Sequence, residues 1–138
     1  HAALWPKAVA ARAHARSVSA EMHSGFQALR EHCPMDFLGR NAKARLPEPV
    51  AADVRRIVAI WQDCRRRHGT GGPFLLGRFC AADAMYAPVV TRFMTYDVKL
   101  EPRLAAYAST IMAMPEMQEW IEAAKAEPAD IEELEVEY

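Results

Sequence analysis

Apolar residues recur along this chain at the three- and four-residue steps of an α-helix. No stretch alternates apolar and polar positions over several residues, so the pattern predicts no β-sheet. The Ala-rich segment from residue 7 to about residue 32 predicts one long amphipathic helix. Its apolar stripe lies at Val18, Met22, Gly25 and Leu29. Pro34 should end this helix, because the residue before a proline resists helical geometry.

A polar connector over residues 35–49 separates this segment from a second predicted helix at about residues 51–68. The apolar stripe of the second helix lies at Val54, Ile57, Val58, Trp61 and Cys64. The basic run at residues 65–68 closes it before Gly69, a pattern typical of a helix C-terminus, where cations oppose the negative end of the dipole. The alternative interpretation of this run is attraction of an anion or a nucleic acid. The dipole accounts for the run without one.

The third helix is predicted to start at Cys80, to continue to about Tyr96, and to be the buried centre of the fold. Its first turns carry almost no charge, whereas a surface helix is polar on one side. With Cys80 at the N-cap, Asp83 falls at the third helical position, where its carboxylate can accept from the N-cap amide. Phe79 stands where a hydrophobic staple to Ala84 would begin.

Two further helices are predicted to begin near prolines that suit a first helical turn. One opens at Glu101-Pro102 and the next at Pro115, each with apolar positions at helical spacing. After Pro128 the sequence becomes acidic. We therefore predict an all-α bundle of about five helices over residues 1–127, followed by an acidic tail over residues 128–138.

Composition narrows the classes of function. With 138 residues, 51% of them hydrophobic, the chain can bury the core of one ordinary domain. Its net charge of −1 suggests neither nucleic acid nor an acidic membrane surface as a partner, and no apolar run approaches the ~20 residues of a membrane span. Cys33, Cys64 and Cys80 are odd in number and far apart, which favours a reducing cytoplasm over a disulfide framework.

Sequence motifs for catalysis or metal binding are not evident. No nucleophile stands beside a base at a helical spacing, and no zinc-protease or serine-hydrolase signature occurs. His14, His23 and His32 recur every nine residues, which places each half a turn out of phase with the last, so they cannot form one row of metal ligands. Cys33 is interpreted as a structural thiol.

The segment from Gly77 to Pro88 resembles the capping-box and staple region that opens the central helix of the C-terminal domain in cytosolic glutathione S-transferases. That family usually has Ser or Thr where this chain has Cys80, then two further residues and an Asp. The resemblance extends from about residues 4–6 to residues 120–121. It implies the same all-helical C-terminal fold.

The resemblance also implies what the rest of the protein does. Because residue 1 is His and no leader pattern follows, we expect a thioredoxin-like domain upstream that binds most of the co-substrate glutathione and holds the catalytic residue. A homodimer is expected. By analogy, this domain supplies the wall against which a small hydrophobic electrophile docks, with Met22 and Phe26 as apolar contacts and His23 or Gln27 as the polar contact. The alternative is a non-catalytic protein–protein interaction module, resembling the helical domains of elongation-factor and aminoacyl-tRNA synthetase subunits.

Overall fold

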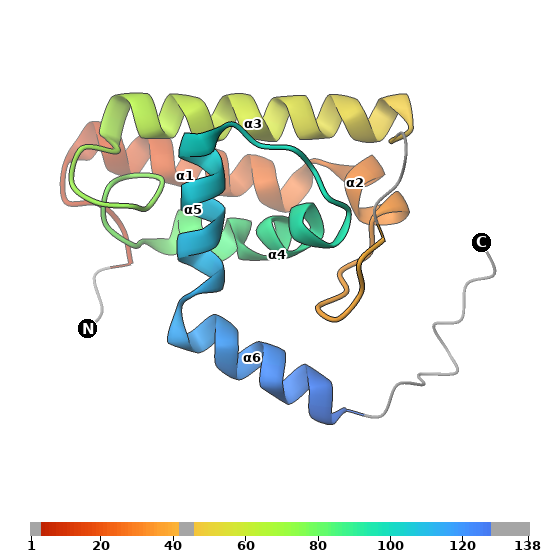
Figure 1. Ribbon diagram of the computed structural model, residues 1–138. Coiled ribbons are helices and arrows are strands. Elements are labelled where there is room, and N and C mark those ends of the chain that lie inside the picture. Colours follow the sequence, from red (N-terminus) through yellow and green to blue (C-terminus); the bar gives the residue numbers. More distant parts are fainter. Residues whose placement is uncertain (1–3, 42–45, 128–138) are drawn as a thin grey trace.

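The computed structural model describes residues 4–41 and 46–127, which form six α-helices and no β-strand. In chain order the helices are α1 (Val9–Ser24), α2 (Gln27–His32), α3 (Glu48–His68), α4 (Ala81–Thr95), α5 (Pro102–Met112) and α6 (Pro115–Ala126) (Figure 1). The predicted all-α class is confirmed. The predicted acidic tail at residues 128–138 lies outside the described residues.

The single long helix predicted for residues 7–32 is wrong, because the chain breaks it into α1 and α2. Gly25 ends α1 with an extended backbone (φ −102°, ψ −170°), and Phe26 adopts the left-handed conformation (φ 60°) before α2 begins. The apolar spacing continues across the break, because Met22, Phe26 and Leu29 are all buried. Periodicity alone therefore could not reveal the change of direction.

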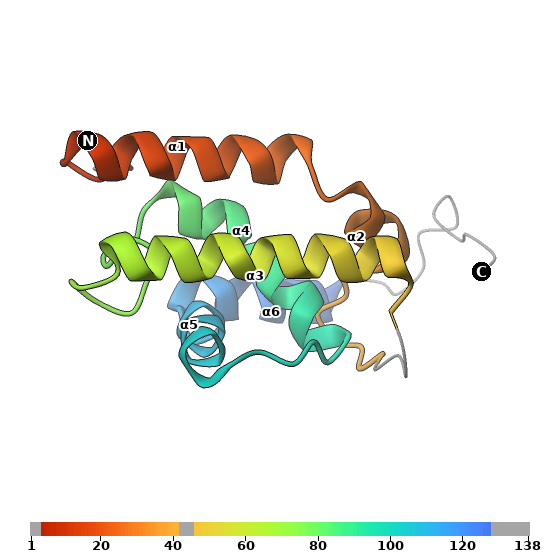
Figure 2. The ribbon, with the colours of Figure 1, turned by 90° about the horizontal axis from the view of Figure 1, so that it is seen from above.

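Helix α4 occupies the centre of the bundle, as predicted. Helices α1 and α3 run alongside each other and α4 passes beneath them, while α5 crosses steeply and α6 lies on the side away from α3 (Figures 1 and 2). Among the α4 residues, only Ala84 and Met94 are exposed. By contrast, the sole buried residue of α6 is Met117. The scarcity of charged residues in α4, which has only Asp83 and Arg92, thus reflects burial on nearly all sides.

The start of α4 is fixed by the buried carboxylate of Asp83. One oxygen accepts from the Cys80 amide at 2.9 Å, forming the capping box, and the other accepts from the Leu75 amide at 2.9 Å. The side chain of Asp83 therefore holds both the helix start and the preceding loop in place.

Phe79 is 44% exposed and its ring contacts Phe74, with centroids 5.4 Å apart.

An aromatic cluster joins the three helices around α4. The indole of Trp61 on α3 is fully buried, with ring centroids 5.9 Å from Tyr86, 5.4 Å from Phe93 and 5.1 Å from Tyr107. Two of these contacts are edge-to-face, the arrangement that aromatic quadrupoles favour. The Tyr86 hydroxyl also donates to the Val18 carbonyl of α1 at 3.2 Å. Side chains of α3, α4 and α5 thus share one core, and Tyr86 ties α1 to it.

Replacing Asp83 should test how much of the fold depends on this carboxylate. Asp83→Ala leaves the buried amides of Leu75 and Cys80 without their acceptor, and we expect a loss of about 2–5 kcal/mol in the free energy of unfolding. Asp83→Asn keeps the volume and one acceptor, so its loss should be about 1–2 kcal/mol. Urea unfolding followed by circular dichroism measures both values. Equal losses in the two variants would contradict this assignment.

The pH dependence of stability provides a second readout. Burial raises the pKa of Asp83, and the hydrogen bonds from Leu75 and Cys80 only partly oppose the rise. The folded state therefore favours the protonated carboxyl, so this contribution to stability is complete below about pH 4, the ordinary range of Asp, and is lost as the pH rises through the raised pKa. Relative to wild type, Asp83→Asn should gain stability between about pH 4 and pH 7. A difference that is constant with pH would contradict the raised pKa.

Candidate functional site

The α1–α2 junction holds all four residues predicted to contact substrate, and its geometry starts from the backbone. A β-carbon added at Gly25 would lie 2.8 Å from the carbonyl oxygen of Glu21, which also accepts the Gly25 amide at 2.8 Å. Glycine is therefore required by close packing against the last turn of α1. The next residue, Phe26, has a left-handed backbone, which is unfavourable for a side chain of this size. Burial of its ring, which is only 7% exposed, offsets this energetic cost.

Side chains from neighbouring helices fix the two helix ends at the junction. The Arg30 guanidinium donates to the carbonyl oxygens of Met22 and His23, the latter at 3.2 Å, and so caps the C-terminus of α1. Asp53 of α3 accepts the Leu29 amide at 3.0 Å and so caps the first turn of α2. Both caps place a charge at the helix end whose dipole it complements.

Two more polar links hold the junction against the bundle. Glu21 of α1 pairs with Arg56 of α3 through both carboxylate oxygens, at 2.6 and 2.9 Å. Arg92 of α4 donates from Nε to the Cys33 carbonyl at 2.9 Å, just after α2. Burial lowers the pKa of Arg92, and the neighbouring charge of Arg30 lowers it further. The junction is therefore tied to both α3 and α4.

The four predicted contact residues divide into an inner and an outer pair. Met22 and Phe26 belong to the hydrophobic core and expose only 8% and 7% of their surface. His23 and Gln27 are exposed, and Gln27 donates to Glu31 on its own helix at 2.7 Å. The structure thus brings the four together at one bend, with the apolar pair beneath and the polar pair at the surface.

The three cysteines are buried and form no disulfide with one another. Burial raises the pKa of Cys64 to about 12, and the nearby Asp63 carboxylate adds to the effect. Burial also raises the pKa of Cys80 to about 11, together with the charge of Asp83. Because the thiolate is the reactive form of cysteine, these two thiols are poor nucleophiles at neutral pH.

Histidines gather at the opposite end of α1 and α3 from the junction. The His14 Nε2 lies 3.6 Å from Asp63 and 3.9 Å from the sulfur of Cys64, and the His14 ring contacts the His68 ring edge-on. Burial lowers the pKa of His14, although the Asp63 carboxylate opposes this shift. Within residues 4–41 and 46–127, no group of three or more His, Cys, Asp or Glu side chains is arranged to hold a metal ion.

Comparison with protein families identifies the family of this chain. The sequence profile of the glutathione S-transferase C-terminal domain matches residues 7–123. The chain belongs to this family. The predicted resemblance is therefore confirmed over nearly the whole of the described helical bundle, and membership implies that glutathione is involved in the protein's activity. A comparison with curated proteins found no match. In the part of the chain that the structure describes, no helix has the length and apolarity to span a membrane.

In this glutathione S-transferase domain, the junction is held by charged side chains that sequence analysis did not single out. Their hydrogen bonds and ion pairs link its segments, and they belong to Arg30, Asp53, Arg56 and Arg92. In the sequence, each looks like an ordinary charged residue on a helix face. The signal that points to them is the pair Gly25-Phe26, since a glycine within an amphipathic pattern marks a place where a helix can end.

Chemical labelling should reveal the suppressed reactivity of the buried thiols. At pH 8 a pKa of about 12 leaves roughly one Cys64 in 10,000 as thiolate, whereas an unperturbed cysteine is roughly one-quarter ionised. In the native chain we expect iodoacetamide to modify Cys64 and Cys80 at least about 100-fold more slowly than in guanidinium, as measured by mass spectrometry of the peptides. Rapid native modification of either thiol would show that its raised pKa is wrong.

Proposed function

We propose that this domain forms the second-substrate half of a glutathione transferase, shaping the pocket for a small hydrophobic electrophile. Family membership over residues 7–123 is the observation that carries the proposal. A thioredoxin-like domain upstream would bind glutathione and lower the pKa of its thiol. The glutathione sulfur then forms a bond to the electrophilic carbon, and the leaving group departs with the bonding electron pair.

The α1–α2 junction suits the role of a pocket wall. Caps at both helix ends and links to α3 and α4 hold its backbone, so the exposed side chains His23 and Gln27 stand on a rigid support. Under the proposal, Met22 and Phe26 support the wall from the core, and the substrate contacts only the 8% and 7% of their surfaces that are exposed. Each Å² of apolar surface buried there contributes ~25 cal/mol. His23 or Gln27 then orients the electrophile or glutathione by a hydrogen bond.

An exposed apolar region supports docking of the upstream domain. Leu4 is 61% exposed and Phe79 is 44% exposed, and both lie at the start of α4, because the Leu4 carbonyl accepts the Ala81 amide at 2.8 Å. Large apolar side chains gathered at one end of a bundle are typical of a surface that another domain covers. We further propose that the complete protein is a cytoplasmic homodimer, the location being in keeping with three cysteines that form no disulfide with one another.

Reconstitution tests the proposal directly. The 138 residues alone should conjugate no glutathione, whereas the same residues joined to the segment encoded upstream should bind immobilised glutathione and conjugate an aromatic halide. The absorbance of the thioether product measures the rate. A joined protein that neither binds glutathione nor conjugates any standard electrophile would instead favour the protein–protein interaction module, which docks partners and catalyses nothing.

Substitutions in the active joined protein test the residues. We expect His23→Ala or Gln27→Ala to lower kcat/KM for the electrophile by about three- to tenfold, the range for loss of one hydrogen bond to substrate. The free energy of unfolding should change little, since both side chains are exposed. Glu119→Ala on α6, also exposed, is the control and should leave kcat/KM unchanged. If neither position differs from the control, the junction is not the substrate wall.

A further inference from the structure

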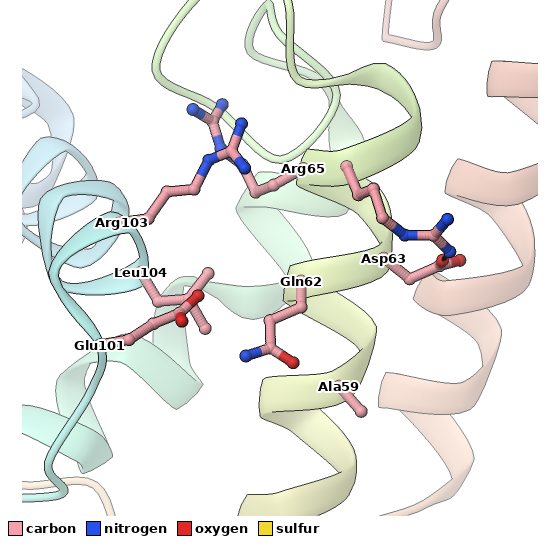
Figure 3. A pocket seen from close by; sticks show the side chains of 8 residues that line it. Ala59, Gln62, Asp63, Arg65, Glu101, Arg103 and Leu104 are labelled. Atoms are coloured by element: carbon pink, nitrogen blue, oxygen red, sulfur yellow. Dashed lines mark hydrogen bonds and ion pairs between the residues drawn. The ribbon is translucent and has the colours of Figure 1, made fainter.

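A cleft of about 440 Å³ lies between α3 and the start of α5, away from the α1–α2 junction. Two helices line it, α3 with Ala59, Gln62, Asp63, Arg65 and Arg66, and the start of α5 with Glu101, Arg103 and Leu104 (Figure 3). Asp63 and Arg66 pair with each other on the α3 wall. This volume falls within the range of small-molecule sites in proteins. Neither the proposed transferase chemistry nor the family match assigns it a role.

The arginines in the basic run that closes α3 differ in whether a carboxylate pairs with their charge. Arg66 and Arg67 both pair with Asp63, so these two cations share a carboxylate. Arg65 instead donates from one terminal nitrogen to carbonyl oxygens of the following loop, including that of Gly72 at 2.8 Å, and its buried Nε has no acceptor among the described residues. The charge of Arg65 therefore meets backbone dipoles and no carboxylate.

Helix α5 brings a second cation and a carboxylate to the same cleft. Within the described residues, Arg103 and Glu101 each lack a hydrogen bond or ion pair through their side chains. Figure 3 shows Arg65 and Arg103 extending to the same end of the cleft, with Glu101 and Gln62 nearer the other end. Ala59 is exposed and provides apolar surface, whereas the side chain of Leu104 is fully buried behind the wall. The cleft thus has a doubly cationic end, an anionic end and an apolar part.

We propose that this cleft binds a zwitterionic amino acid or short peptide. Arg65 and Arg103 receive its carboxylate, since guanidinium groups match the planar geometry of that group. Glu101 and the carbonyl oxygen of Gln62 receive its ammonium group. An apolar side chain of the ligand covers Ala59, which is exposed. The two ends of the ligand thus pair with both charges that the protein leaves open.

Other anionic ligands suit the cleft less well. Inorganic phosphate would pair with the two arginines, but it would leave Glu101 unpaired and meet its negative charge. A nucleic acid would face the same carboxylate, on a chain whose net charge is −1. The carboxylate at Glu101 is therefore what selects a ligand that carries charge of both signs.

Titration of the 138-residue chain with the dipeptide glycyl-leucine tests the proposal by amide chemical shifts in NMR spectra. A ligand of this size should bind with Kd on the order of 1 mM and perturb the amides of α3 and α5 that border the cleft. N-acetyl-glycyl-leucine lacks the ammonium group and glycyl-leucinamide lacks the carboxylate, so each should bind at least about tenfold more weakly. Absence of saturable shifts at the cleft would overturn the proposal.

Variants and an anion control separate the remaining outcomes. Arg103→Gln should weaken glycyl-leucine binding by about tenfold, because one charge-assisted contact to the carboxylate is lost. The matched control Arg16→Gln, at an exposed position on α1, should leave Kd unchanged. Binding that survives in Arg103→Gln, or phosphate shifts equal to those of the dipeptide, would show that the cleft does not recognise a zwitterion. Because this readout involves no conjugation, its failure and that of the transferase proposal are distinguishable.

Discussion

A single buried carboxylate organises the helical bundle. Asp83 has no exposed surface, and its two oxygens accept the amides of Leu75 and Cys80. Burial of an unpaired carboxylate would cost several kcal/mol, so the helix start and the loop must remain where they satisfy it. Tyr107 of α5 packs close by, where burial raises the pKa of its hydroxyl and the Asp83 charge raises it further. The central helix, its loop and α5 are thereby positioned from one point.

Sequence analysis predicted the elements that depend on local signals. The capping position of Asp83, the stripe around Trp61 and the prolines at the starts of α5 and α6 all act within a few residues, and the helices begin there or one residue later. The same approach missed the α1–α2 break. At that point the apolar spacing is continuous across Gly25, and contacts from distant segments, namely Asp53 with Leu29 and Glu21 with Arg56, hold the turn that Gly25 permits.

The candidate site shows the same contrast between local sequence signals and contacts that only the fold creates. The family resemblance pointed to four residues that lie close together in the sequence, but it did not predict the bend between them, which depends on the left-handed backbone of Phe26. A continuous helix would place Phe26 and Met22 on one face by their spacing of four, and the turn at Gly25 does not expose either. The turn keeps the ring of Phe26 and the thioether of Met22 in the core while His23 and Gln27 remain at the surface.

The arginines of this domain differ in which groups pair with their guanidinium charges, and this difference distinguishes structural roles from binding roles. Arg30 caps a helix C-terminus with its guanidinium, Arg92 donates to two backbone carbonyls, and Arg56 is held by a carboxylate. Removing any of them leaves an acceptor or a charge unpaired within the fold. Arg103 differs, because no described group forms a hydrogen bond or ion pair with its side chain. Its charge beside Arg65 is therefore not needed to hold the fold together. The proposed zwitterionic ligand therefore draws on a cation and a carboxylate of the cleft, Arg103 and Glu101, whose charges are not needed within the described fold.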